Sequence, residues 1–475
     1  MEIRNTEQLL SHGNVAGRKV VLDILEAGLR ASDPYDAVRR LVRIENGTLI
    51  IDASAAIRDV GAASGVAGSL SFDLADVGHI YVIGGGKAAQ RQAQALEDTL
   101  GDLITAGHVN AKKGDSVALK RIGVTLAGHP LPDERSVAGA RKIVEVAQKA
   151  RKGDIVFFSE SGGGSALLTL PAPGLTLQDL QDLNRVLYFE HGATMWETNA
   201  VRNLLTVLRS QEIRYVGEAT FIQISTEERP LGLRVNATRS SGRLWGAAAY
   251  EHAIEVLHQY NCWNRVSESV RRYLLAGNPK YGPLSPEELA RMHKYSVAGP
   301  QQMLEAAQKR ARELGLNAAI VASSLSDVEA KAAADVFAFM AQEVEVYDRP
   351  QAAPCVFICG GELLVTVGAG TGVGGRNQEF VLSMVPRIAG STRAVGASVD
   401  SDGSDGPTDS AGGIVDGQTL ERARTLGIDI YKEMRQHNSC PTLEKLGDTI
   451  DTGIRGTNVQ DLRVVYVGPA NSPER

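Results

Sequence analysis

The stretch HIYVIGGGKAAQRQAQALEDTL, residues 79–100, decides the fold. It opens with a short β-rich run, His79–Ile83, continues through a glycine turn at 84–86 and ends in an Ala- and Gln-rich segment typical of a helix. The same order returns at Asp154–Ser159, where DIVFFS precedes the glycine-rich segment 161–165. Because strands that alternate with helices form βαβ units, we predict an α/β fold with a mostly parallel sheet.

Outside these two segments, the hydrophobic pattern predicts a series of further strands and helices. The best candidate for a linker is the Pro-bearing stretch Tyr347–Pro354, and we therefore predict a larger N-terminal domain over 1–345 and a smaller α/β domain over 346–475. Residues 230–245 and 277–300 fit no single pattern. The predicted strands are 219–225, 319–324, 355–359, 363–367, 394–399 and 463–467, and the predicted helices are 15–30, 34–43, 88–100, 176–192, 302–314, 327–343, 377–387 and 418–426.

Composition bounds the function. The 475 residues carry 50 basic and 56 acidic side chains, which leaves a formal charge of −6 and disfavours a partner rich in phosphate, such as nucleic acid or a membrane surface. No apolar run is long enough to cross a membrane, the first residues are charged, and the four cysteines are scattered. We expect a cytoplasmic protein that binds neither nucleic acid nor membranes.

Three glycine-rich turns, at 84–86, 162–164 and 368–375, each follow a predicted strand. Ligands of open α/β sheets bind at the carboxyl ends of strands, where a helix start presents free amides to an anion. Glycine also serves tight turns that bind nothing, but three such turns favour a phosphate-bearing ligand. Lys87, directly after the first turn, is placed to direct its ammonium group at that anion, with a solvated helix-start lysine as the alternative.

Two of these turns also fit dinucleotide-binding spacings. Residues 84–89 fit G-x-G-x-x-A and residues 370–375 fit G-x-G-x-x-G, which keeps an NAD(P)H-dependent oxidoreductase open. Such a site needs an acidic residue about 20 positions on, to hold the ribose hydroxyls. Neither 104–113 nor 390–397 contains one, although Lys112 or Arg393 could serve a 2′-phosphate.

The run DSDGSDGPTD at 400–409 places four carboxylates in a tight loop directly after an apolar strand. Like charges this close repel one another unless a cation compensates them, and Mg²⁺ held by carboxylates and a nucleotide phosphate would do so. The alternative is a solvated turn in which Asp acts as turn former and helix cap. Arg376 begins a helix, where a cation is unfavourable, so we predict that it binds an anion. His129 lies in a Pro-containing turn and has either a catalytic or a structural role.

Six segments together resemble the class II glycerate kinases, a family that carries a C-terminal MOFRL domain and whose members are often labelled hydroxypyruvate reductases. The resemblance implies a Rossmann-like N-terminal domain, a smaller C-terminal α/β domain, an active site in the cleft between them, and ATP- and Mg²⁺-dependent phosphorylation of a hydroxyl of glycerate. By motif match, Lys87 and Arg376 are implied to be catalytic. The six segments are IGGGKAA (83–89), GHPLPDE (128–134), SGGGSALL (161–168), GGRNQE (374–379), DGSDGPTDSAG (402–412) and GTNVQDL (456–462).

The remaining site residues follow from the same motifs and from the loops described above. The partners we predict are a small hydroxy acid as substrate and, as an open alternative, a second copy of the chain. The predicted nucleotide- and phosphate-binding residues are Gly84, Gly85, Gly86, Ser161, Gly162, Gly163, Gly164, Ser165, Asn377 and Asn458; the predicted substrate-binding residues are Arg202, His129 and Glu362; the predicted metal ligands are Asp400, Asp402 and Asp405.

The chain departs from the family pattern at three places. Residues 201–206 read VRNLLT, where the family has V-R-K-H-L-S followed by a basic-glycine turn. Residues 224–230 read ISTEERP and lack the family's Asp, and residues 452–459 read TGIRGTNV, with Arg455 as an added charge. We infer a divergent member that phosphorylates glycerate or a related sugar acid. The alternatives are a hydroxypyruvate reductase and a kinase-like ligand-binding protein with reduced or lost activity.

Overall fold

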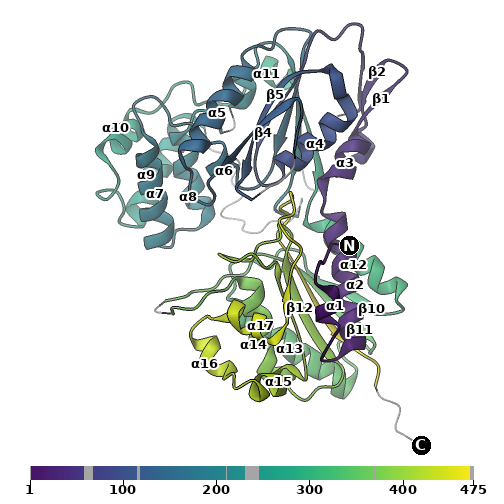
Figure 1. Cartoon of the computed structure of the whole chain (residues 1–475). Helices are drawn as coiled ribbons and strands as arrows, with labels where there is room; N and C mark the ends of the chain where they lie inside the picture. Colours follow the sequence, from purple (N-terminus) through teal and green to yellow (C-terminus); the bar gives the residue numbers. More distant parts are fainter. Residues whose placement is uncertain are drawn as a thin grey trace, which may run out of the picture. The chain divides into compact units, whose positions relative to one another are not determined.

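The computed structural model describes residues 2–57, 68–114, 118–209, 211–230, 245–368 and 370–470. Contacts divide the chain into two compact units (Figure 1). The central unit contains Pro34–Thr226 and Leu231–Val297, and the terminal unit contains Met1–Asp33, Glu227–Pro230 and Ala298–Arg475. This division differs from the predicted boundary near residue 345, because the first residues of the chain belong with the last ones.

The central unit is built on a six-stranded sheet in the order β6-β5-β4-β7-β8-β9. Every adjacent pair from β6 to β8 is parallel, as the sequence predicts. Strands β4 and β7 are buried on both faces, which explains their continuous apolar runs. The strands are β4 (Ile80–Gly85), β5 (Ile104–Lys112), β6 (Ile122–Ala127), β7 (Ile155–Glu160), β8 (Thr220–Thr226) and β9 (Met292–Ala298), beside a small antiparallel sheet of β1 (Val42–Glu45), β2 (Thr48–Ile51) and β3 (Leu70–Asp73).

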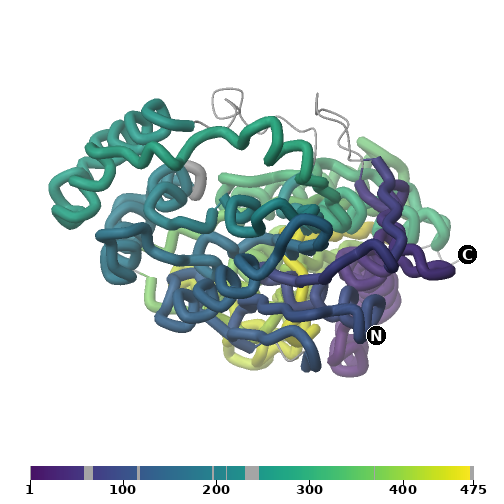
Figure 2. Tube along the Cα trace, turned by 90° about the horizontal axis from the view of Figure 1, so that it is seen from above, coloured from purple at the N-terminus to yellow at the C-terminus, as the bar shows by residue number. Residues whose placement is uncertain are grey.

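Alternate residues of β4 enter two different cores. Ile80 and Val82 pack with helices α3 and α4, whereas Tyr81 and Ile83 pack with helix α5, so helices cover both faces of the sheet. Helices α7 to α10 gather to one side of the sheet around a core of their own (Figures 1 and 2). The helices of this unit are α3 (Pro34–Leu41), α4 (Ala89–Leu100), α5 (Glu134–Ala147), α6 (Gly164–Leu167), α7 (Leu177–Asn184), α8 (Met195–Arg202), α9 (Gly246–Gln259), α10 (Glu268–Ala276) and α11 (Pro286–Arg291).

The predicted helix over 176–192 is interrupted in the structure. Thr176 and Asp179 form the reciprocal capping pair that starts α7. The regular helix ends at Asn184, and the π-helical segment Arg185–Glu190 continues it.

The terminal unit contains a mixed six-stranded sheet in the order β10-β11-β15-β12-β13-β14. Only β10 and β11 are parallel, and each other neighbouring pair is antiparallel. The strands are β10 (Asn317–Ala322), β11 (Cys355–Gly361), β12 (Ala394–Asp400), β13 (Gly412–Asp416), β14 (Thr449–Ile450) and β15 (Asp461–Val467). Its helices are α1 (Thr6–Leu9), α2 (Val15–Ala31), α12 (Pro300–Glu313), α13 (Ala330–Tyr347), α14 (Arg376–Ile388), α15 (Thr419–Thr425), α16 (Ile430–Arg435) and α17 (Ser439–Leu446).

One prediction for this unit is corrected. The strand predicted at 363–367 is absent from the described residues, where Leu364 makes only an isolated bridge with Glu329. The stretch Tyr347–Pro354, predicted as a linker, leads from the end of α13 to the start of β11.

Helix α2 fastens the start of the chain to the terminal unit. Its apolar face shares a core with α12 and with strands of the sheet, and a Cβ at Gly28 would lie 2.5 Å from Leu462 Cδ2. The fully buried Arg18 donates to Asp416 at 2.5 Å and to Asp448 at 2.8 Å. A buried cation is costly unless it is paired, so both carboxylates are needed here.

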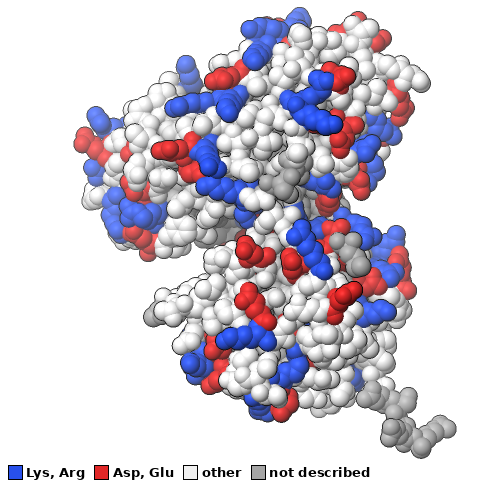
Figure 3. Space-filling view, viewed as in Figure 1, with Lys and Arg blue, Asp and Glu red and all other residues white. Residues whose placement is uncertain are grey.

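No helix among the described residues is long and apolar enough to cross a membrane. On the face shown in Figure 3, acidic and basic side chains are interspersed.

Candidate functional site

In the central unit, two of the predicted glycine turns lie at the same edge of the sheet. Strands β4 and β7 are parallel neighbours with Gly85 paired to Glu160, so the turns that follow them meet. The amide of Lys87 donates to the carbonyl of Gly162 at 2.9 Å, and the amide of Ala88 donates to Ser161 Oγ at 2.8 Å. These bonds join the first turn to the second turn.

Lys87 and His129 meet at Gly163. This glycine adopts a φ of +83°, which L-residues with a side chain rarely do. A Cβ there would lie 3.0 Å from His129 Cδ2 and 3.3 Å from Lys87 Cγ. The structure thus brings together a lysine, a histidine and both glycine turns, and the roles predicted for them remain predictions.

Arg209, which is not among the predicted site residues, also lies at this edge. A Cβ at Gly164 would lie 2.6 Å from Arg209 Nη1. An isolated antiparallel bridge pairs Thr206 with Pro171, which follows the glycine turn, and so returns the chain to that turn. No motif in the sequence marks this bridge. Arg209 forms an ion pair with Glu160 at 3.5 Å.

Arg202, predicted to bind substrate, lies buried among the helices of the central unit. Its Nη1 donates to Asn184 Oδ1 at 3.0 Å, and its Nε donates to Asn199 Oδ1 at 2.7 Å. These bonds tie the end of α8 to α7, and the substrate-binding role predicted for Arg202 stays a prediction.

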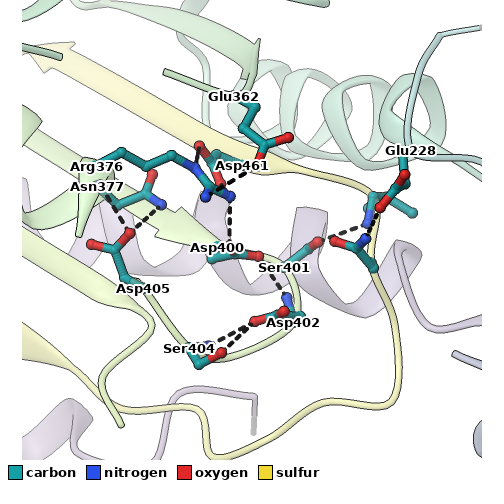
Figure 4. Close-up of polar contacts among 12 residues, drawn as sticks. Glu228, Glu362, Arg376, Asn377, Asp400, Ser401, Asp402, Ser404, Asp405 and Asp461 are labelled. Atoms are coloured by element: carbon teal, nitrogen blue, oxygen red, sulfur yellow. Dashed lines mark hydrogen bonds and ion pairs between the residues drawn. The ribbon is translucent and has the colours of Figure 1, made fainter. Parts of the chain in front are cut away.

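In the terminal unit, Arg376 is surrounded by carboxylates (Figure 4). Asp461 accepts two hydrogen bonds from it at 2.8 Å, Asp400 accepts one at 2.7 Å, and Glu362 lies 3.2 Å away. Burial alone would lower the pKa of Arg376, but Asp461, Glu362 and Asp400 raise it well above its ordinary value. The charge that we predicted to await an anion is therefore already compensated by the protein.

The aspartate loop does not form a carboxylate cage for a metal. Asp405 accepts from the backbone amides of Asn377 and Gln378 and so caps α14, and its burial raises its pKa to about 6. Asp400 is bound to Arg376, while Asp402 Oδ1 accepts from the amide and hydroxyl of Ser404.

Figure 4 shows these three carboxylates directed at different partners. Across the described ranges, no group of three or more His, Cys, Asp or Glu residues could hold a metal ion. In this arrangement the loop contains turn-forming and helix-capping carboxylates, and the metal-binding role of Asp400, Asp402 and Asp405 stays a prediction.

The two predicted asparagines have protein partners. Asn377 is completely buried, and it donates to Asp405 and accepts from Ser398 Oγ, so its predicted contact with nucleotide is not supported by its position. Asn458 donates to Glu228, which lies in the stretch where the family's Asp is missing.

The added charge at Arg455 has a structural explanation. Its side chain pairs with Glu2 and donates to the carbonyl of Leu29 at 2.7 Å and to that of Ser401 at 3.2 Å. Arg455 thus connects the start of the chain and the end of α2 to the aspartate loop.

Comparison with known proteins gives the family. The model described as a domain of unknown function (DUF4147) matches residues 20–275, and the model of the MOFRL family matches residues 355–461. The chain is 35% identical to glycerate 2-kinase of Pyrococcus horikoshii. The alignment of 456 residues covers 94% of this chain and 98% of that protein. The chain belongs to the class II glycerate kinase family. The crystal structure of glycerate kinase from Thermotoga maritima has a TM-score of 0.73 and 31% identity, and covers 94% of this chain and 99% of that one.

Another relative in this family, a putative hydroxypyruvate reductase of Agrobacterium vitis, is 34% identical and covers 82% of this chain and 88% of that protein. The site does not favour that activity in this glycerate kinase family member. Strand β5 follows the first dinucleotide-like turn and ends in Asn110, Ala111 and Lys112, where a ribose-binding acid would be needed. The second such turn does not follow a strand, and Arg393 donates instead to the carbonyls of Gly468 and Glu345.

Proposed function

We propose that this protein is a glycerate kinase, which transfers a phosphoryl group from ATP to a hydroxyl of glycerate or a closely related sugar acid. The observation that carries the proposal is the kinship with glycerate 2-kinase of Pyrococcus horikoshii along almost the whole of both chains. The cluster of Lys87, His129 and the two glycine turns also supports the proposal, because it gathers groups that can bind phosphate and a hydroxyl.

Phosphoryl transfer demands positioning and charge stabilisation more than covalent chemistry from the protein. We assign Lys87 to the stabilisation of negative charge on the transferred group. The turn at 161–165 brings backbone amides to this edge of the sheet, and we assign them to donate to phosphate or carboxylate oxygens. His129, whose ring lies beside Gly163, is assigned to bind the hydroxyl of the acceptor.

Magnesium is part of the proposal as the partner of the nucleotide. Mg²⁺ keeps several waters and binds substrate phosphates, with one or two carboxylates from a protein. Because Asp400 and Asp405 are already engaged by Arg376 and by α14, the aspartate loop does not fit a preformed metal cage.

The test offers Mg-ATP and a panel of three- to five-carbon sugar acids to the purified protein while ADP release is followed. We expect ADP release that requires an acceptor, is greatest with glycerate, and falls about 100-fold or more in Lys87→Met. The matched control is Lys149→Met, which removes an exposed lysine of the same unit and is expected to leave the rate unchanged.

A parallel assay follows NAD(P)H oxidation with hydroxypyruvate. Steady cofactor oxidation without ADP release would overturn the kinase in favour of the reductase. No turnover in either assay, together with thermal stabilisation by nucleotide, would overturn it in favour of a ligand-binding protein.

A further inference from the structure

Arg209 stands at the glycine turn of the central unit without a full set of partners. Its ion pair with Glu160 is long, at 3.5 Å, and the carboxylate of Glu160 also accepts from Gln223. Within the part of the chain that the structure describes, the Nε of Arg209 is buried and has no hydrogen-bond partner. A buried guanidinium donor without an acceptor is costly, and the chain does not supply every acceptor that the guanidinium of Arg209 requires.

The surroundings of Arg209 show where such an acceptor would bind. On one side of the turn, the guanidinium of Arg209 packs against Gly164, where a Cβ would lie only 2.6 Å from Nη1. On the other side, Gly163 faces His129 and Lys87 in the same way. Glycine at both positions keeps the turn bare between one arginine on one side and a lysine and a histidine on the other. Two cations that face one bare turn suit a ligand that carries negative charge on several oxygens.

Arginine, more than lysine, fits this task. Its planar guanidinium presents donors in a fixed fork that matches the two oxygens of a carboxylate or phosphate. We propose that Arg209 is a further binding residue of this enzyme, which holds an oxyanion of one reactant at the turn 161–165. The oxyanion is either the carboxylate of the acceptor acid or a phosphate of the nucleotide, and Glu160 orients the guanidinium for it. The kinetic form of this inference rests on the proposed kinase function.

The competing explanation is a purely structural ion pair between Arg209 and Glu160. Arg209→Met keeps the length and packing of the side chain but removes its charge, and Arg209→Lys keeps the charge but removes the fork. The matched control is Arg214→Met, because Arg214 forms an ion pair with Glu288 at 3.1 Å in the same unit, outside the proposed site.

The experiment measures kcat and the KM values for glycerate and for ATP separately, together with the melting temperature of each variant. We expect one of the two KM values to rise roughly 10- to 100-fold in Arg209→Met, less in Arg209→Lys, and not at all in Arg214→Met. A rise in the KM for glycerate identifies the acceptor carboxylate, and a rise in the KM for ATP identifies a nucleotide phosphate. Both KM values within twofold of wild type, with only a lower melting temperature, would overturn the inference.

Calorimetric titration with glycerate alone and with ATP alone keeps this inference separable from the proposed function. If the wild-type protein turns over no substrate, the kinase fails, yet weaker binding of either ligand to Arg209→Met still supports the role of Arg209. If the enzyme is an active kinase and Arg209→Met binds both ligands like the wild type, the role of Arg209 fails and the kinase stands.

Discussion

For Arg376, the sequence indicates the need for a negative charge nearby but not the residue that supplies it. A cation at the start of a helix is unfavourable, and for this reason Arg376 was predicted to bind an anion. The partner is Asp461, far away in the sequence, and no local pattern could name it. The same limit explains the aspartate loop, because sequence shows how many carboxylates are close together but not which amide or guanidinium each one meets.

Gly163 allows a prediction at the scale of one residue. Gly163→Ala adds a strained backbone conformation and crowds His129 and Lys87, whereas Gly174→Ala adds the strain alone, because Gly174 has a φ of +85° and open space around its Cβ position. We expect each change to cost about 1–2 kcal/mol of stability. Only Gly163→Ala is expected to lower kcat/KM, by about tenfold or more.

Thermal unfolding and steady-state kinetics on both alanine variants check this expectation. Equal loss of kcat/KM in the two variants would show that backbone strain, and not crowding at the turn, limits the reaction.

Strands were predicted well where a neighbour pairs with them. The buried runs of β4 and β7 are confirmed, because an apolar stretch of that length between turns fits the interior of a parallel sheet. The run LLVTV at 363–367 has the same β-forming composition, yet Leu364 makes only an isolated bridge. Propensity measures how well side chains fit a sheet and does not supply the adjacent strand.

His108 in strand β5 is expected to make the free energy of unfolding depend on pH. Burial, with a smaller effect of Lys142, lowers the pKa of His108 to about 4, and a Cβ at its cross-strand partner Gly123 would lie 2.6 Å from His108 Nδ1. A histidine whose pKa is lower in the folded state stabilises the fold fully above about pH 6.5 and loses that contribution as pH falls towards 4. Relative to His108→Gln, we expect the wild type to lose about 2–3 kcal/mol of unfolding free energy between pH 7 and pH 4.

Urea unfolding followed by tryptophan fluorescence measures this difference, because Trp196, Trp245 and Trp263 all belong to the central unit. Other groups that titrate in this range affect both proteins alike and cancel. A difference that stays constant with pH would contradict a depressed pKa at His108.

At the scale of the whole molecule, the α/β architecture follows from the sequence, whereas the contacts that divide the chain into two units do not. Helix α2 was correctly predicted as a helix, yet nothing in its residues says that it packs on α12 and β15 of the terminal unit. A linker was sought in Pro-bearing sequence, which is a local property. The division is a property of long-range contacts, and it separates one chain into units that are each discontinuous in sequence.

The first residues of the chain should therefore stabilise a fragment of its last ones. We expect residues 298–470 to be more resistant to urea in the presence of a peptide of residues 2–33 than alone, because α2 buries Leu22, Leu25 and Leu29 in their core. A peptide with Arg18→Met should bind about 100-fold more weakly or worse, since Asp416 would keep a buried charge without its cation and Asp448 would keep only one of its two arginine partners.

Circular dichroism of the fragment with each peptide measures the unfolding midpoint. An unchanged midpoint with the unmodified peptide would show that the fragment does not need the N-terminal helix.

The order of strands in the terminal unit also determines when this sheet can be completed during translation. Strand β15 lies between β11 and β12, and it follows every other strand of that sheet in the sequence. During translation, β11 and β12 must wait with exposed edges until residue 467 has emerged from the ribosome, whereas all six strands of the central sheet are already outside. Until then, the nascent protein carries a sheet that lacks the strand between β11 and β12. We expect chaperones to matter most at this stage, because these two strand edges are exposed.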